Sequence, residues 1–98
     1  MAQTVKSISL QAQQQKIFLE KPLVLRRIFF RITALLPLAA NYQSKISFDD
    51  PMFYDFYSLL GPAVYFEAKG EGICQGDIWV RNASTISVYY AVTEILVD

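Results

Sequence analysis

The chain contains 98 residues, of which 53% are hydrophobic and 14% aromatic, and its nine basic and nine acidic residues leave it without net charge. This length predicts a single domain, residues 1–98, and the apolar content excludes intrinsic disorder. A neutral chain gives no reason to expect nucleic acid as a partner, and the absence of histidine excludes Ser–His and Cys–His catalytic pairs.

Two features of the composition point to contacts between subunits. The apolar content is high for one small core, so we expect a homo-oligomer, a dimer or trimer, or a large partner interface. The charges are also split, because residues 1–45 carry a net charge of +6 and residues 46–98 a net charge of −6. Either the two halves interleave as neighbouring strands that pair locally, or a basic face of one subunit meets an acidic face of another.

The first twenty residues predict two strands and no leader peptide. Residues 1–16 are polar and lack the hydrophobic stretch of a secretory signal. Residues 4–10 alternate between apolar and polar side chains, which predicts a first strand, although residues 1–15 could instead form a partly extended arm. Residues 16–20 predict a short strand that Lys21 and Pro22 end.

Residues 22–40 are the most apolar part of the chain, yet they contain Arg26, Arg27 and Arg31. A membrane-spanning helix needs about 20 apolar residues with few charges, so these arginines exclude a membrane span. An amphipathic helix would put Phe30 on its polar face. We therefore predict a soluble strand, with a bulge or a strand start at Arg26, where the alternation breaks.

This strand predicts an apolar inner face and a mixed outer face. Alternation places Ile28, Phe30 and Ile32 inside, and Arg27, Phe29 and Arg31 outside. The outer face is a candidate protein contact, although the arginine side chains could simply cover Phe29.

The rest of the chain predicts an all-β fold. Strand patterns recur at residues 44–48, 64–69, 78–81 and 86–93, and residues 95–97 are apolar on both faces. Seven or eight short strands, with turn signals every 8–15 residues, predict an antiparallel β-sandwich or jelly roll.

Residues 48–62 interrupt the strand pattern. Asp50 and Pro51 predict a turn or a helix start, and aromatic residues follow at helical spacing, so we expect a short helix or an aromatic loop near residues 51–60. Long interruptions often carry function. Together with the outer face, this segment supplies the candidate interface residues: Arg27, Phe29, Arg31, Phe53, Tyr54, Phe56 and Tyr57.

No residue pattern predicts catalysis, a metal site or a bound cofactor. Asp49, Asp50 and Asp55 lack the register of a calcium loop, which favours a capped, solvated turn. A pair of glycosidase carboxylates needs a cleft that a chain of this size has little room for. Trp79 and Tyr89 are candidates for stacking on sugars, as in carbohydrate-binding modules.

One resemblance covers about half of the chain. The segment GPAVYFEAKGEGICQGDIWVRNASTISVYYAVTEILVD is similar to the closing half of small phage virion modules with a jelly-roll or related β-sandwich fold, and KPLVLRRIFFRITA resembles their early core strand. The resemblance implies a non-enzymatic capsid cement or decoration protein, or a related tail or fibre module. It also implies the major capsid protein or another virion protein as partner, and a place in the virion after assembly in the host cytoplasm.

Overall fold

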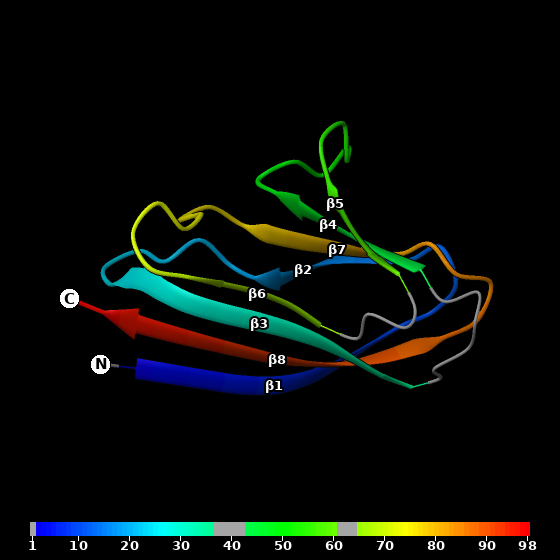
Figure 1. Ribbon diagram of the computed structural model, residues 1–98, viewed down its shortest axis with the longest axis horizontal. Coiled ribbons are helices and arrows are strands. Elements are labelled where there is room, and N and C mark those ends of the chain that lie inside the picture. Colours follow the sequence, from blue (N-terminus) through cyan, green and yellow to red (C-terminus); the bar gives the residue numbers. More distant parts are fainter. Residues whose placement is uncertain (1, 37–42, 61–64) are drawn as a thin grey trace.

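The computed structural model describes residues 2–36, 43–60 and 65–98. These residues form eight strands in two antiparallel four-stranded sheets and contain no helix (Figure 1). The strands are β1 (Ala2–Leu10), β2 (Gln15–Leu19), β3 (Arg26–Leu36), β4 (Gln43–Phe48), β5 (Tyr57–Leu60), β6 (Tyr65–Lys69), β7 (Ile78–Asn82) and β8 (Val88–Val97).

The strand order is that of a jelly roll. One sheet, here called sheet A, has the order β1-β8-β3-β6, and the other, sheet B, has the order β2-β7-β4-β5. The chain crosses between the sheets at most connections, and β1 and β8 lie side by side although they are the first and last strands. The predicted all-β sandwich or jelly roll is therefore confirmed.

The core lies between the two sheets and follows the alternation of the strands. Edge-to-face contact between Phe18 of β2 and Tyr90 of β8, with ring centroids 5.0 Å apart, joins the layers. The Tyr90 hydroxyl also hydrogen-bonds the hydroxyl of Ser44 in β4, so these two buried hydroxyl groups are paired across the core. The buried apolar side chains are Leu10, Phe18, Leu19, Phe30, Ile32, Ala34, Ile46, Leu59, Ile78, Val80, Val88, Tyr90 and Val92.

Most predicted strand ranges are confirmed, with three differences. Residues 2–10 are strand β1, paired with β8 along its whole length, and not an arm. The predicted strands at 86–93 and 95–97 belong to one strand, β8, which begins at Val88, so residues 86 and 87 precede it. The predicted strand at 64–69 begins at Tyr65 among the described residues, and Val64 lies outside them.

The segment near residues 51–60 is a loop followed by a strand, so the alternative of a helix is wrong. Residues 51–56 form turns, and β5 begins at Tyr57. Asp49 and Phe53 have positive φ angles of 56° and 55°, which a right-handed helix cannot accommodate. The aromatic residues have helical spacing, but no helix forms, because the backbone turns at Asp49 and at Phe53.

The prediction that Arg27 lies on the outer face is also wrong, because Arg27 is completely buried. Strand β3 begins at Arg26, as one of the two alternatives predicted, but its register against β8 shifts between Arg27 and Phe29. This bulge at Ile28 reverses the alternation and turns Arg27 into the sandwich. The buried side chain therefore leaves the predicted set of interface residues.

Arg27 is satisfied by five hydrogen bonds from its side chain and backbone. Its Nε donates to Glu94 Oε2 at 2.8 Å, and its terminal nitrogens donate to the carbonyl oxygens of Cys74, Gly76 and Glu20 at 2.6, 2.9 and 3.0 Å. Its backbone N–H donates to the side chain of Gln75 at 2.8 Å. A buried charge is tolerated only when paired and hydrogen-bonded in this way.

Removal of the buried cation should destabilise the fold strongly. We expect Arg27→Met to lower the free energy of unfolding by about 3–5 kcal/mol, because it leaves the buried Glu94 carboxylate without its cation. Arg31→Met is the matched control, since it makes the same change at an exposed arginine of the same strand, and we expect a loss below about 1 kcal/mol. Chemical denaturation followed by the fluorescence of Trp79 measures both, and equal losses would contradict the assigned role of Arg27.

Candidate functional site

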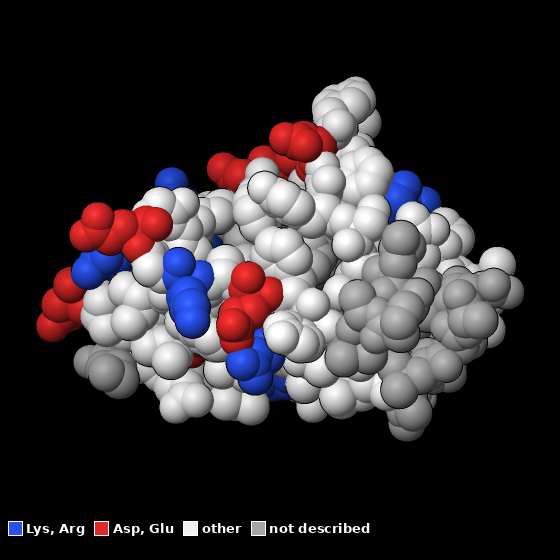
Figure 2. Space-filling view, in the orientation of Figure 1, with Lys and Arg blue, Asp and Glu red and all other residues white. Residues whose placement is uncertain are grey.

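The loop between β4 and β5, residues 49–56 and here called the β4–β5 loop, is the most prominent projection of the described structure. It stands above the sandwich at the top of Figure 1. Met52 is 66% exposed, Tyr54 84% and Phe56 40%. In the same orientation, Figure 2 shows an uncharged projection there with acidic side chains beside it. The loop thus exposes three large apolar side chains to solvent.

Asp50 organises the backbone of this loop. One carboxylate oxygen accepts a hydrogen bond from the N–H of Met52 at 3.0 Å, and the other accepts from the N–H of Tyr54 at 2.8 Å and of Asp55 at 3.3 Å. The Ser47 hydroxyl donates to the carbonyl oxygen of Asp50 at 2.7 Å. Aspartate commonly stabilises turns in this manner. The loop is therefore shaped by its own sequence before any partner binds.

Neighbouring segments fix the base of the loop. The side-chain amide of Gln15 donates to the carbonyl oxygen of Pro51 at 2.9 Å, and the N–H of Asp49 donates to the carbonyl oxygen of Asp77 at 2.7 Å. A Cβ atom at Gly76 would lie 2.8 Å from Cγ of Asp49, so only glycine fits against this turn. These contacts join the loop to β2 and to the connection that precedes β7.

The predicted interface residues of this segment differ in their surroundings. Tyr57 is 55% exposed, but its ring centroid lies 5.3 Å from those of both Phe48 and Phe66. The contact with Phe66 joins edge strand β5 of sheet B to edge strand β6 of sheet A. Phe53 is half-buried, whereas Phe56 lies under the ammonium group of Lys45, 4.6 Å from its ring centroid. Tyr54 is the most exposed aromatic residue of the group.

The remaining two predicted interface residues lie on the outer face of sheet A, away from the loop. Arg31 forms an ion pair with Glu67, which lies directly opposite on β6, and its guanidinium carbon lies 5.8 and 5.5 Å from the rings of Phe29 and Tyr65. Arg31 thus covers Phe29, which is half-buried. This geometry favours the interpretation that the arginine shields an aromatic residue of its own chain.

Two ion pairs among the described residues join the basic half of the chain to the acidic half. Arg27 pairs with Glu94, and Arg31 pairs with Glu67. Both cross between neighbouring strands of sheet A. The uneven distribution of charge along the sequence is therefore explained, at these positions, by interleaved strands that pair locally.

Trp79 and Tyr89 do not form one stacking platform. Trp79 alternates with the buried Ile78 and Val80 and faces outward from sheet B, whereas Tyr89 alternates with buried residues of β8 and faces outward from sheet A. The two rings therefore lie on opposite surfaces of the sandwich. The two candidate stacking residues therefore cannot contact one sugar together, and alternation alone did not place β7 and β8 in different sheets.

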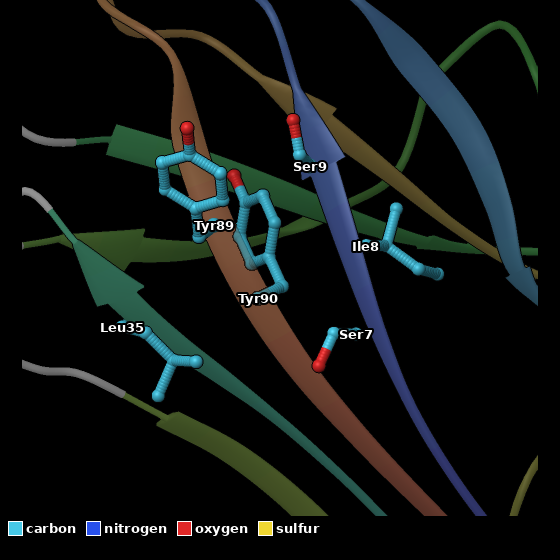
Figure 3. A pocket seen from close by; sticks show the side chains of 6 residues that line it. All are labelled: Ser7, Ile8, Ser9, Leu35, Tyr89 and Tyr90. Atoms are coloured by element: carbon cyan, nitrogen blue, oxygen red, sulfur yellow. The ribbon is translucent and has the colours of Figure 1, made fainter.

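Tyr89 lies instead in a shallow depression on sheet A. The depression has a volume of about 460 Å³ and is lined by residues of β1, β3 and β8 (Figure 3). The hydroxyl groups of Ser7 and Ser9 are its polar groups besides the tyrosines, and Leu35 borders it. The alternation of β1 in the sequence already predicted that both serines share one face. That they lie beside the ring of Tyr89 follows only from the pairing of Ser9 with Tyr89, which the structure shows.

No protein-family model and no curated protein sequence matches the chain. In the described part of the chain, no helix is long and apolar enough to cross a membrane. The same residues contain no group of three or more cysteine, aspartate or glutamate side chains placed to hold a metal ion.

Removal of the Asp50 carboxylate should loosen the β4–β5 loop without unfolding the sandwich. In Asp50→Ala we expect the amide hydrogens of Met52 and Tyr54 to exchange roughly tenfold faster or more, because a hydrogen bond to a charged acceptor contributes about 1.5–3 kcal/mol. Amide hydrogen exchange measures the effect, with strand β7 as the internal reference. Asp55→Ala removes a carboxylate from the same loop but leaves Asp50 in place. Equal exchange in the two variants would show that Asp50 does not hold the loop.

Proposed function

We propose that this protein is a non-enzymatic structural component of a virus particle, a capsid cement or decoration protein that binds the major capsid protein and stabilises the shell. The β4–β5 loop supports this proposal more than any other feature. It is a projecting loop whose backbone is held by Asp50 and which exposes Tyr54, Phe56 and Met52. The resemblance of residues 61–98 to phage virion modules agrees with this assignment.

A loop of this kind is suited to protein recognition. Aromatic residues and methionine are enriched where proteins contact each other, and a few such residues supply most of the binding energy. Because Asp50 already orders the backbone, binding loses less conformational entropy than it would with a flexible loop. A single loop offers a small contact area, but a shell presents the same surface many times, so modest contacts suffice when copies are linked.

The location of the protein in particles tests the proposal directly. Particles made by the virus that encodes the chain are purified, the copy number of the chain is measured by mass spectrometry, and its position is determined by electron cryomicroscopy. We expect density on the shell, with the β4–β5 loop at the contact with the major capsid protein. Density only in the tail or a fibre would replace the cement role with the alternative of a tail or fibre module, and absence from particles would refute both.

Substitutions in the loop should weaken attachment to the shell. We expect Tyr54→Ala and Phe56→Ala each to reduce the affinity for shells that lack the protein by at least about tenfold, because buried aromatic anchors dominate such interfaces. Cosedimentation with empty shells measures the affinity. Tyr89→Ala is the matched control, since Tyr89 is also an exposed tyrosine but lies on sheet A, away from the loop. Equal losses for Tyr54→Ala and Tyr89→Ala would contradict a contact through the loop.

Carbohydrate binding is a second candidate function, and one observation favours it. The ring of Tyr89 lies in the shallow depression with the hydroxyl groups of Ser7 and Ser9, and sugars bind by stacking on such rings beside polar groups. This function predicts binding on a glycan array that Tyr89→Ala abolishes and Trp79→Ala leaves unchanged, because Trp79 lies on the opposite sheet. A silent array would exclude it.

A further inference from the structure

Strand β1 is a long sheet edge without a neighbour on one side among the described residues. It pairs with β8 over residues 2–10, and its other side has no hydrogen-bonded strand in the part of the chain that the structure describes. In Figure 1 it forms the lower border of sheet A. Its nine residues exceed the five, four and five residues of the other edge strands β2, β5 and β6. An edge of this length presents an uninterrupted row of backbone donors and acceptors.

The other edges carry features that discourage pairing, and β1 carries few of them. Strand β2 has a register irregularity after Ile17, and β6 bears Glu67 and Lys69. Strand β1 contains no proline, its register against β8 is unbroken, and Lys6 is its one charged residue. Val5, next to the middle of the strand, is 69% exposed. Proteins that remain monomeric usually protect such an edge.

We propose that β1 pairs with β1 of a second copy of this chain, antiparallel and about a two-fold axis that passes through Val5. The register places Val5 opposite the partner's Val5 and Thr4 opposite the partner's Lys6, and it extends over residues 2–8 of each copy. The axis is perpendicular to sheet A, so outward-facing side chains of both copies remain on one face. The two copies of sheet A then form one continuous eight-stranded sheet, and the β1 edge of each copy is used by the other, which closes the assembly as a dimer.

The side chains of β1 favour this register over its neighbours. A two-fold axis at Lys6 would place the two ammonium groups directly opposite each other, which destabilises an antiparallel pair. An axis at Ser7 would place Lys6 opposite the apolar Ile8. The axis at Val5 instead pairs two β-branched side chains, which pack well on a sheet surface. Registers shifted by one residue would join the outer face of one sheet to the core face of the other.

Disulfide trapping tests both the dimer and its register. In a Cys74→Ser background, which removes the single native cysteine, Val5→Cys is expected to form a disulfide-linked dimer under mild oxidation, because directly opposite residues have Cα atoms about 4.5–5.5 Å apart. Ser9→Cys is the matched control on the same exposed face. Its two copies would be separated by roughly 27 Å and should not cross-link. Cross-linking of Ser9→Cys to the same extent, or none at Val5→Cys, would overturn the register.

Sedimentation tests the dimer without any cross-link. We expect the unmodified chain to sediment at twice its mass of 11.2 kDa at high concentration and to dissociate on dilution. Val5→Lys should shift this dissociation to at least tenfold higher concentration, since it places two cations opposite each other, whereas Ser9→Lys adds the same charge outside the paired residues and should not. A chain that is monomeric throughout, or a dimer equally sensitive to both substitutions, would overturn the proposal. Sedimentation uses the chain without shells, so a result that overturns the dimer does not bear on the proposed binding to the capsid.

Discussion

The buried ion pair between Arg27 and Glu94 joins the two central strands of sheet A, and the remaining donors of Arg27 extend its influence to both connections at that end of the sandwich. They bind carbonyl oxygens of Glu20, just after β2, and of Cys74 and Gly76, between β6 and β7. Gln75 closes the arrangement by bonding both the N–H and the carbonyl oxygen of Arg27. One guanidinium group thereby holds the β2–β3 and β6–β7 connections, both of which run between the two sheets.

The same end of the molecule supports the candidate site. Gly76, whose carbonyl oxygen accepts from Arg27, packs against Asp49, and the N–H of Asp49 donates to the carbonyl oxygen of Asp77. Asp49 in turn precedes Asp50, the residue that shapes the β4–β5 loop. A continuous chain of contacts therefore runs from the buried cation to the exposed aromatic residues. The rigidity of the loop depends on core structure as well as on its own sequence.

Sequence periodicity predicted the strands well, because burial of one face forces alternation in each of them. It failed at Arg27, since a single bulge exchanges the faces and lies at Ile28, two residues beyond Arg26, where the break in alternation predicted a bulge or a strand start. The turn at Asp50 and Pro51 was visible in the sequence, but the positive φ angles of Asp49 and Phe53 were not. Relations between strands distant in sequence were beyond reach, so the sequence named Trp79 and Tyr89 as stacking candidates without showing that they face opposite ways.

The β1 edge and the β4–β5 loop are compatible with simultaneous use. Figure 1 places them on opposite borders of the sandwich, so pairing through β1 leaves the loop uncovered. A two-fold axis perpendicular to sheet A keeps sheet B of both copies on the same side of the dimer, and each loop belongs to sheet B. Each loop then lies at the border of the dimer farthest from the two-fold axis, where β1 pairing does not cover it. Two linked contacts raise the effective concentration for the second one, which suits attachment to a surface that repeats regularly.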